Sequence, residues 1–511
     1  MTAAALHLHP TDNTCVAVAA LQAGELIQAG EHQVQLVEDV PFGHKIALQP
    51  IARGRAILKY GQTLGFAARD IEPGQWVHTH NVELGELRLD YAPASETPAP
   101  PEPMTDQTFQ GYRRADGRYG TRNYLAVIST VNCSASVARY IAERFNGDAL
   151  QAFPNIDGVV AFRHQSGCAM QFDGLNHRIL NRVSGGIAKH PNIGGVLLVG
   201  LGCEQAAMGH LVQSQGLLQI GDNGQSHGPV MLSMQDVGGT RKTVEAGIEH
   251  VARLLPRAND VRRETAPASE LILATECGGS DGNSGITANP AVGVAADLLV
   301  ACGGTAILAE TSEVFGAEHL LTRRAVSAEV ANKLIERIEW WKEYASLHGG
   351  ELDNNPSVGN KAGGLTTIVE KSLGAVAKGG STALVDVYHY AEPVVAKGFV
   401  FMDTPGFDPP SVTGMVAGGA NVAVFTTGRG SCFGCKPTPC LKIATNTPMF
   451  ERLEEDMDIN AGQVLSGKTV AEMGREIFDH VLEVASGRPT KSEQLGIGDD
   501  EFVPWNVGPV L

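Results

Sequence analysis

The sequence has no apolar run long enough to cross a membrane. A transmembrane helix needs about 20 consecutive apolar residues, and no stretch of the 511 residues reaches that length. The first ten residues, MTAAALHLHP, also lack the basic region, apolar stretch and cleavage site of a secretory signal. We therefore expect a cytoplasmic protein that does not bind a membrane.

Positive charge is scarce. Lys and Arg number 39 against 56 Asp and Glu, which gives a formal net charge of −17 at pH 7. Nucleic-acid phosphates and anionic lipids bind clustered Lys and Arg side chains. The charge balance therefore argues against a nucleic-acid partner and favours a small-molecule ligand.

Three common functional signatures are missing from the sequence. No GxGxxG follows the first strand of the α/β part, no glycine-rich segment matches the phosphate-binding P-loop, and no GxSxG elbow or Ser-His-Asp arrangement is recognisable. A nucleotide cofactor and a serine-hydrolase mechanism consequently have little support.

The chain divides into a β-rich part, a Pro-rich segment and a long α/β part. Residues 1–90 contain short apolar runs separated by Gly- and Pro-containing turns, which predict a small β domain. Residues 91–108 include APASETPAPPEPMT, a composition typical of an extended linker.

After residue 108, apolar strands such as 125–128, 196–199 and 422–425 alternate with helical segments. This pattern indicates parallel sheets that are covered by helices on both faces, so the predicted fold class is α/β. A charged tract at 262–265 predicts a boundary between a second α/β domain, 109–265, and a C-terminal Rossmann-like α/β domain, 266–511.

Four predicted strands run into a cysteine, at Cys133, Cys168, Cys203 and Cys277, and a fifth ends at Glu310. The spacing is close to one or two βαβ units. Because ligands bind beyond the carboxyl ends of parallel strands, these side chains are expected to converge in one crevice. Thiolates are good ligands for iron or zinc. The alternative is that small cysteine side chains only pack in tight turns.

Several histidines are candidate site residues. His78 and His80 stand two apart in QWVHTHN and would share one face of a strand, where they could bind a metal or simply face solvent. His164 follows a predicted strand beside Cys168, which makes it the better candidate for acid–base chemistry, with an ordinary core histidine as the alternative. His44 is a further imidazole.

Glycine-rich loops supply further candidates. Residues 278–285 and 355–364 combine Gly with hydroxyl, amide and charged groups, which could cradle a polyol or merely form flexible turns. Arg429 lies between two glycines after a strand, where its guanidinium could bind a carboxylate bidentately. The alternative is an ordinary surface arginine. The CxxC at Cys432 and Cys435 has no second pair, so structural zinc is unsupported there.

With these residues in view, the chain resembles the altronate and galactarate dehydratase family over nearly its whole length. The segments that carry the resemblance are GHKIAL at 43–48, YGQTLGFA at 60–67, GLGCE at 200–204, CGGSDGNSGITANPAVG at 277–293, NPSVGNKAGG at 355–364 and TTGRG at 426–430. The resemblance implies an N-terminal β-clip domain of the SAF type, a second domain associated with homodimer formation, and a C-terminal Rossmann-like domain.

The resemblance also bears on the substrate. WVHTHN at 76–81 is similar to the altronate-type segment, whereas galactarate dehydratases tend to lack this histidine pair. The segment from Ser431 departs from the Thr-Pro-Tyr-Gly stretch of the enterobacterial enzymes of both kinds. A related branch eliminates sulfite from sulfolactate, but there the two parts usually lie on separate chains, so the fused arrangement favours a sugar acid.

The resemblance implies a dehydration that needs iron under reducing conditions. A metal would stabilise an enediolate-like intermediate and help the β-hydroxyl depart while a base removes the α-proton. A noncatalytic sugar-acid sensor is the alternative from another class. The candidate residues are His164 as base, with His44 and Lys361 as other catalytic candidates, Arg429 and Lys361 for the carboxylate, and Ser280, Asp281, Asn360 and Thr427 for the rest of the substrate.

Two iron sites remain open at this point. In one, Fe²⁺ is held by His78, His80 and an oxygen ligand such as Glu310. In the other, three or four of the strand-end cysteines hold an iron–sulfur cluster with one open iron.

Overall fold

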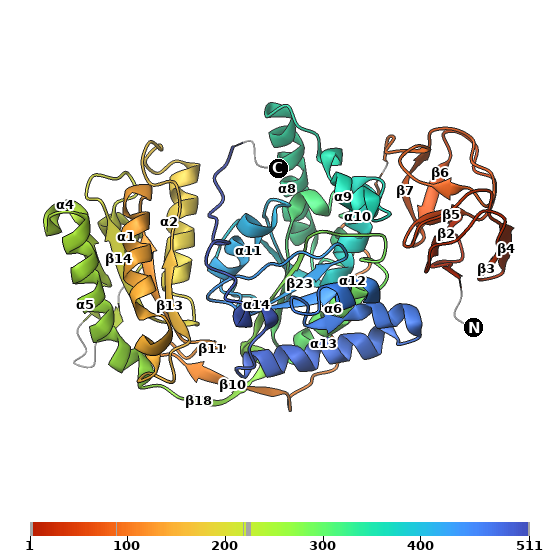
Figure 1. Cartoon of the computed structure of the whole chain (residues 1–511). Helices are drawn as coiled ribbons and strands as arrows, with labels where there is room; N and C mark the ends of the chain where they lie inside the picture. The colour runs from red at the N-terminus through yellow and green to blue at the C-terminus, as the bar shows by residue number, and fades with distance from the viewer. Residues whose placement is uncertain (1–3, 88, 218, 221–225, 509–511) are drawn as a thin grey trace.

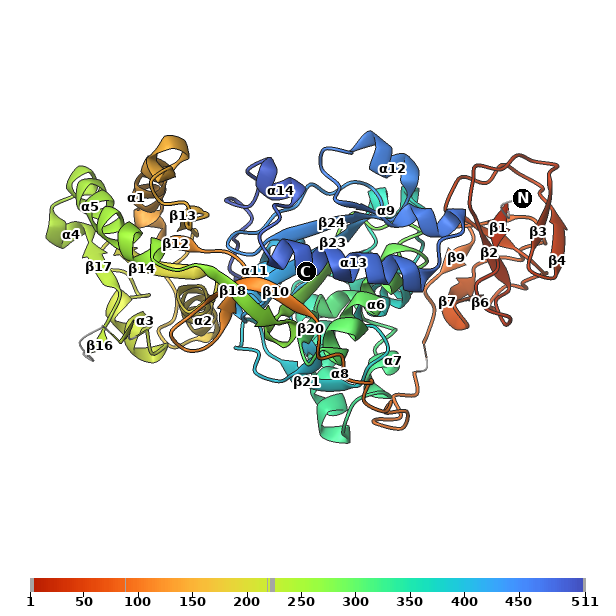
Figure 2. The same cartoon turned by 90° about the horizontal axis from the view of Figure 1, so that it is seen from below.

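The computed structural model describes residues 4–87, 89–217, 219–220 and 226–508. The C-terminal α/β domain lies in the middle of the molecule, with the N-terminal β domain on one side and the second α/β domain on the other (Figures 1 and 2). The predicted α/β fold class with an N-terminal β domain is thereby confirmed. None of the helices among the described residues is long and apolar enough to cross a membrane.

The N-terminal domain consists of short antiparallel strands in three small sheets, ordered β1-β2-β5-β8, β3-β4 and β6-β7-β9. The turns at Gly24, Gly54 and Gly74 adopt positive φ angles of 86°, 76° and 82°, a conformation that favours glycine and keeps the strands short. The strands are β1 (Ala5–Leu6), β2 (Thr14–Ala17), β3 (Leu26–Ala29), β4 (His32–Gln35), β5 (Lys45–Ala47), β6 (Ala56–Lys59), β7 (Gln62–Ala67), β8 (Trp76–Val77) and β9 (Val82–Glu83).

One face of this domain shares its apolar core with the C-terminal domain. Ile57 and Leu64 are fully buried in the same cluster as Ile368 and Leu373 of the C-terminal domain. Burial of apolar surface across the boundary fixes the position of the N-terminal domain.

The Pro-rich segment after this domain has no helix or strand from residue 91 to residue 107. Its backbone nevertheless bonds to the C-terminal domain, because Ala94 N donates to Thr322 O and Met104 N donates to Ala301 O, each at 2.9 Å. The segment is therefore extended, as predicted, but lies against the C-terminal domain instead of hanging free as a tether.

The second domain is built on a parallel sheet of order β13-β12-β14-β17. A three-stranded antiparallel sheet, β11-β10-β18, joins its two ends to the C-terminal domain. The strands are β10 (Thr108–Arg113), β11 (Tyr119–Gly120), β12 (Tyr124–Ser129), β13 (Gly158–Phe162), β14 (Ile193–Gly200), β15 (Gln219–Ile220), β16 (Ser226–His227), β17 (Val230–Ser233) and β18 (Arg263–Pro267), and the helices are α1 (Asn132–Ala142), α2 (Leu175–Ala188), α3 (Met208–Ser214), α4 (Met234–Val237) and α5 (Thr240–Asn259).

The C-terminal domain has a seven-stranded parallel sheet of order β21-β22-β20-β19-β23-β24-β25. Apolar clusters that include α6 and α13 on one face and α11 on the other explain why its strands are apolar throughout. The strands are β19 (Ile272–Cys277), β20 (Thr305–Leu308), β21 (Leu384–Tyr388), β22 (Gly398–Met402), β23 (Val422–Thr427), β24 (Cys440–Ala444) and β25 (Ile459–Asn460). The helices are α6 (Ala288–Ala301), α7 (His319–Thr322), α8 (Ala328–Leu347), α9 (Val358–Ala362), α10 (Ile368–Ala375), α11 (Asp408–Ala417), α12 (Thr447–Arg452), α13 (Val470–Ala485) and α14 (Lys491–Gln494).

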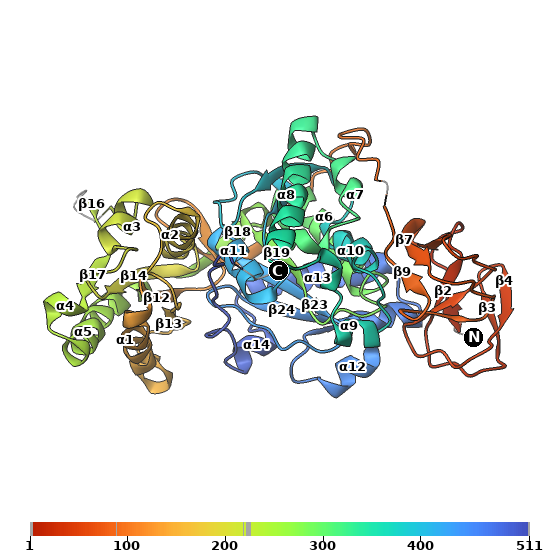
Figure 3. The same ribbon diagram turned by 90° about the horizontal axis from the view of Figure 1, so that it is seen from above.

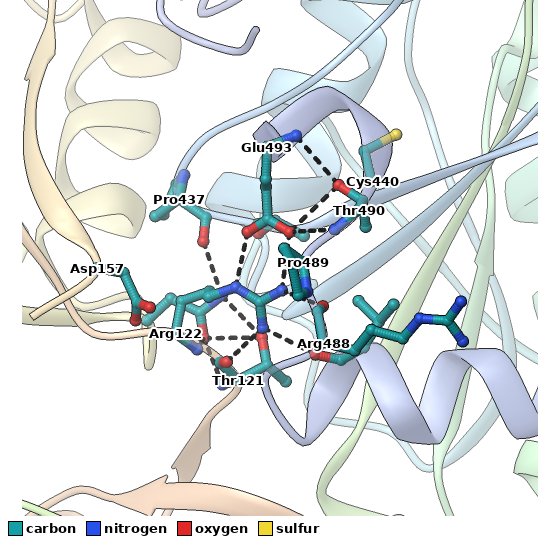
Figure 4. A network of polar contacts seen from close by, with 12 residues as sticks. Thr121, Arg122, Asp157, Pro437, Cys440, Arg488, Pro489, Thr490 and Glu493 are labelled. Atoms are coloured by element: carbon teal, nitrogen blue, oxygen red, sulfur yellow. Dashed lines mark hydrogen bonds and ion pairs between the residues drawn. The ribbon is translucent and has the colours of Figure 1, made fainter. Parts of the chain in front are cut away.

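A buried arginine holds the second domain to the C-terminal domain (Figure 4). The Arg122 guanidinium donates to both carboxylate oxygens of Glu493 on α14, at 2.7 and 2.8 Å, and to the carbonyl oxygens of Val484 and Arg488 at 2.8 and 2.9 Å. Its side chain is only 3% exposed. A bidentate pair of this kind fixes orientation as well as distance between the two domains.

Candidate active site

The strand order of the C-terminal sheet reverses at β19, and the carboxyl ends of β19 and β23 there are the candidate ligand site, called the crevice below. From β19 the chain first adds β20 on one side of the sheet and later adds β23 on the other side. Ligands of open α/β sheets bind beyond the carboxyl ends of the strands at such a point. The loops after β19 and β23 meet there, because Gly428 N and Arg429 N both donate to Gly279 O, at 3.1 and 2.8 Å.

Two more glycine-rich segments join this crevice. In the 355–364 loop, Asn360 Nδ2 donates to Ser280 O at 2.9 Å, and Gly282 N donates to Gly363 O at 2.8 Å. From the N-terminal domain, the Gly43 carbonyl approaches so closely that a Cβ on Gly282 would lie 2.0 Å from its oxygen. The structure therefore brings together four sequence segments: 43–45, 278–285, 355–364 and 426–430.

A buried charge cluster anchors the N-terminal segment to α10. Lys45 Nζ lies 2.7 Å, and Lys59 Nζ 3.0 Å, from the carboxylate of Glu370. Burial alone would raise the pKa of Glu370, but the two ammonium groups outweigh it and hold that pKa below the usual range. Burial lowers the pKa of Lys45 to about 8, so Lys45 is still charged at pH 7. This triad aligns the N-terminal domain with the crevice.

The Asp281 carboxylate bonds to the loops around the crevice and is not free to contact a ligand. Its two carboxylate oxygens accept hydrogen bonds from the hydroxyls of Ser284 and Thr445 at 3.0 Å and from Asn446 Nδ2 at 3.1 Å. A carboxylate filled by protein donors has little capacity left for a ligand hydroxyl. The predicted substrate contact of Asp281 is therefore replaced by a positioning role.

Ser280 and Asn360 differ in whether the side chain is free to contact a ligand. Ser280 is 3% exposed, and its Oγ has no hydrogen-bond partner among the described residues. The Asn360 side chain donates to the Ser280 carbonyl and forms the capping box of α9 with Ser357. Ser280 thus keeps a free hydroxyl, whereas Asn360 positions the loop. Thr427 also shapes a turn, because its Oγ1 accepts from Gly430 N and Ser431 N at 3.0 Å.

Four aromatic rings gather where the N-terminal domain meets the 355–364 loop. Trp76 Nε1 donates to His44 Nδ1 at 3.0 Å, so the proton of neutral His44 is on Nε2, which donates to Ala362 O at 3.3 Å. His78 stacks on Trp76, with ring centroids 5.0 Å apart, and the His80 ring lies 5.3 Å from Trp76. Both nitrogens of His44 are used, so a ligand could not bind it without breaking these bonds.

His78 and His80 follow β8 instead of lying within it. Neither ring forms a hydrogen bond with another described residue, and His78 Nδ1 is buried without a partner. Burial and the nearby Lys45 lower the pKa of His78 to about 3, and burial lowers that of His44 to about 4. His78 is therefore neutral at pH 7, the form that binds metals.

Two positive side chains have no anionic partner within the described part of the chain. Arg429 is exposed and Lys361 is half-buried, and neither forms an ion pair with another described residue. Lys361 lies in α9 and Arg429 in the loop after β23, and the two segments adjoin because a Cβ on Gly363, directly after α9, would lie 3.2 Å from Arg429 Cδ. Their charges are available for a carboxylate ligand.

Beneath the crevice lies a buried group of carboxylates and lysines. Lys378 Nζ lies 2.5 Å from Glu310 Oε2 and 2.9 Å from Cys277 Sγ. Lys371 Nζ lies 2.6 Å from Glu313 Oε1. Glu310 adopts a left-handed backbone conformation with φ of 67°, a strain that a non-glycine residue bears only where the surroundings hold it.

Several pKa values in this group are raised. Burial, and then Glu310, raise the pKa of the Cys277 thiol to about 12, so it is a neutral thiol and not a thiolate. Burial raises the pKa of Glu313 to about 7, and burial with Glu310 and Glu313 raises that of Asp408 to about 7. Asp408 is half-buried and adjoins the loop after β19, since a Cβ on Gly278 would lie 2.3 Å from its Oδ2.

The strand-end cysteines do not all converge. Cys133, Cys168 and Cys203 follow β12, β13 and β14 of the second domain, whereas Cys277 ends β19 in the other sheet. The prediction of one shared crevice for all four is wrong, because equal spacing along the chain does not reveal that two separate sheets are formed. The second domain and the N-terminal domain lie at opposite ends of the C-terminal domain (Figure 3).

His164 belongs to the second domain as well. It is 7% exposed, its Nδ1 accepts from Ser166 N at 3.2 Å, and burial lowers its pKa to about 4. Within one chain the structure thus separates His164 from Arg429 and Lys361.

Family models match all three parts of the chain. The model described as "Altronate/galactarate dehydratase SAF domain" matches residues 3–85. The model "D-galactarate dehydratase/Altronate hydrolase, second domain" matches residues 111–259, and "D-galactarate/Altronate dehydratase, C-terminal" matches residues 268–510. The chain belongs to the altronate/galactarate dehydratase family.

Relatives in this family span the whole chain. The galactarate dehydratase (L-threo-forming) of Escherichia coli K12 is 40% identical over 100% of this chain and 98% of its own length. The altronate dehydratase of the same organism is 37% identical over 96% of each chain. The (2R)-sulfolactate sulfo-lyase subunit beta of Chromohalobacter salexigens is 31% identical over 77% of this chain and 96% of its own.

The iron that the family resemblance implies can be tested against the geometry. Cys277, Glu310 and Glu313 present ligand atoms within 4.8 Å of one another, as do Glu276, Glu310 and Asp408. Lysine ammonium groups already neutralise Glu310 and Glu313, and neither group includes a histidine. The trio of His78, His80 and Glu310 is therefore not formed among the described residues. His78 and His80 stay candidates by chemistry alone, because neutral imidazole is an iron ligand.

Several residues of this candidate site escaped the sequence analysis. Glu370, Lys378 and Asp408 carry no motif spacing that marks them, and their partners lie far away in sequence. Only Asp408 gave a local signal, an acidic residue before two prolines at the start of a helix. The predicted homodimer and cytoplasmic location stay predictions.

Proposed function

We propose that this chain dehydrates altronate to a 2-keto-3-deoxy acid. Family membership supports a carbon–oxygen lyase that acts on a sugar acid. The observation that carries the proposal is the convergence of four segments, three of them glycine-rich, on a crevice that holds two unpaired cations and a free hydroxyl.

The side chains of the crevice suit the parts of such a substrate. Arg429 and Lys361 bind the carboxylate, whose charge they match. The Ser280 hydroxyl, which has no partner among the described residues, bonds to a substrate hydroxyl. The buried ion pairs Lys378–Glu310 and Lys371–Glu313 below the crevice need no charge from the ligand.

Asp408 is the proposed proton acceptor. Its pKa of about 7 makes it half-ionised near neutral pH, the optimum for a general base. It would take the α-proton while Arg429 stabilises the carboxylate that becomes an enediolate. The β-hydroxyl then leaves as hydroxide, which takes the proton from Asp408 to become water, and the resulting enol tautomerises to the keto acid.

Fe²⁺ is the proposed cofactor, with His78 and His80 as ligands. When bound, the metal would supply Lewis-acid stabilisation of negative charge on oxygen. The two imidazoles are suited to this role because they have no protein partners among the described residues, and Trp76 holds the His78 ring in place.

The test is keto-acid release by the anaerobically purified protein, with and without added Fe²⁺. Altronate, galactarate and sulfolactate would be compared at equal concentrations. Turnover of altronate above the others supports the proposal, whereas preference for galactarate assigns the activity of the relative that is 40% identical. Tight binding of altronate without keto-acid release would make the protein a sensor.

Replacing Arg429 by Ala should lower kcat/KM by about 10–100-fold, because a charge-assisted hydrogen bond to the substrate carboxylate is lost. Arg452→Ala is the matched control, since Arg452 is an exposed arginine on α12 of the same domain. Equal kcat/KM values for the two variants would remove Arg429 from the carboxylate site.

Replacing Asp408 by Asn should lower kcat by about 10²–10⁴-fold without unfolding the protein. The wild-type kcat should rise with pH through about 7, because only the ionised carboxylate accepts a proton, and this acid limb should be missing from the residual activity of the variant. Asp479→Asn, at an exposed position on α13, should leave the profile unchanged. Retention of the same acid limb in Asp408→Asn would show that another group is the base.

A further inference from the structure

The second domain carries three exposed cysteines at one edge of its sheet. Cys133, Cys168 and Cys203 follow the three adjacent parallel strands β12, β13 and β14. Cysteine is among the most frequently buried residue types, and packing in tight turns is the usual reason for a cysteine at a strand end. Exposure of all three removes that explanation.

Hydrogen bonds join the three loops at positions next to the cysteines. Asn132 N, beside Cys133, donates to Ser166 O at 2.9 Å. Gly167 O, beside Cys168, accepts from Ala206 N at 3.0 Å. Glu204, beside Cys203, accepts from Thr130 Oγ1 at 2.9 Å. Each cysteine-bearing loop is thus tied to both others.

Two of the three sulfurs have a helix N-terminus or a hydrogen-bond donor beside them. Cys133 lies in the first turn of α1, an 11-residue helix that has no acidic residue in that turn, so the positive end of the helix dipole faces the thiol. Gln235 Nε2 donates to Cys203 Sγ at 3.3 Å. Gly202 and Ala169, each next to a cysteine, adopt positive φ angles of 120° and 53°. Hydrogen bonds to sulfur are a common feature of iron–sulfur sites.

The separation of the sulfurs argues against a single tetrahedral zinc ion. The three Sγ atoms do not all lie within 4.8 Å of one another. Thiolates on one tetrahedral zinc, at about 2.3 Å from the metal, would be closer together than that. A cluster with several irons places each thiolate on a different iron and spreads them further apart.

We propose that Cys133, Cys168 and Cys203 bind an iron–sulfur cluster of the [4Fe–4S] type, with one iron that has no cysteine ligand. Cys277 is not part of this site, because it is buried in the other sheet beside Lys378. The site is separate from the crevice between the N-terminal and C-terminal domains, and the proposal does not depend on the dehydratase proposal.

The test is purification of the full chain without oxygen, followed by iron and acid-labile sulfide analysis and visible and electron paramagnetic resonance spectra. The expected result is about four sulfide per chain with a cluster spectrum, and about four iron, or about five where the Fe²⁺ proposed at His78 and His80 is also bound. These readouts do not require turnover, so failure of the dehydratase assay would leave them unaffected. The proposal would be overturned if the protein showed no cluster spectrum and no sulfide even after reconstitution with iron, sulfide and reductant. Stoichiometric zinc would also overturn it.

Single Ser replacements of Cys133, Cys168 and Cys203 should each reduce acid-labile sulfide to below about one per chain and iron to about one at most, because a cluster needs its thiolates. Cys432→Ser is the matched control, since Cys432 is an exposed cysteine in the other α/β domain and should keep the full cluster. Cys277→Ser should also keep it, and loss in that variant alone would move the cluster to the C-terminal domain. Circular dichroism would check that each variant is folded.

Discussion

Replacing Glu370 by Gln is expected to lower the free energy of unfolding by about 3–5 kcal/mol, among the largest effects of any single substitution here. The Lys45 and Lys59 side chains are 0% and 1% exposed and depend on the Glu370 carboxylate for their charge balance. Gln has a similar shape but no charge, so both ammonium groups would remain buried without an anionic partner, with only the carbonyl oxygens of Gly364 and Gly282 as acceptors outside residue 370. The N-terminal domain should then leave the crevice more easily, and turnover should fall with it.

Thermal unfolding, together with proteolysis at the Pro-rich segment 91–107, would measure this effect. Because the Glu370 pKa is held below its ordinary value of 4.5, its contribution is present above that pH and is lost as pH falls through the folded-state pKa. The difference between wild type and variant should therefore be full at pH 7 and shrink in acid. Glu318→Gln is the control, since Glu318 is equally buried, accepts a hydrogen bond from Tyr91 at 3.1 Å and forms no ion pair with another described residue. Equal destabilisation by the two variants would contradict the proposed role of the triad.

Replacing Lys378 by Met should also cost about 3–5 kcal/mol, and it should lower the Tm by on the order of 10 °C. Lys378 is fully buried and provides the cation for Glu310, with Cys277 and Glu276 close by. Without it, one carboxyl must bind a proton or remain charged in the interior. Methionine fills nearly the same space, so the loss would reflect charge and not a cavity.

Lys442→Met separates this effect from the general effect of replacing a buried lysine. Lys442 is also fully buried, but its Nζ donates to Phe433 O at 3.3 Å and pairs with no carboxylate in the described part of the chain. Removing a buried charge that lacks an anionic partner should be neutral or stabilising. The idea fails if both variants have the same Tm.

Local patterns were sufficient for the architecture. Apolar runs between glycine-rich turns predicted the β domain, and the alternation of apolar strands with helices predicted the parallel sheets, because burial of each strand depends on its own residues. The glycine-rich segments around Ser280, Asn360 and Arg429 were also identified from sequence, and the structure brings them together.

The partners of buried charges could not be predicted in this way. Lys45 meets Glu370 across 325 positions, and Lys378 meets Cys277 across 101 positions, with no motif that links either pair. Asp281 resembled a ligand contact in sequence, but its carboxylate is filled by donors from a segment more than 160 residues away. Such contacts depend on how whole domains pack.

The sequence by itself determined that the chain forms an N-terminal β domain followed by α/β domains, and it marked the cysteines and the loops that matter, because strand pattern and turn chemistry are local. Only the tertiary structure decided that Cys133, Cys168 and Cys203 share one sheet while Cys277 lies in another, and that the N-terminal domain completes the crevice. The physical reason is that sheet membership and domain docking depend on apolar burial and charge pairing between residues far apart in the chain.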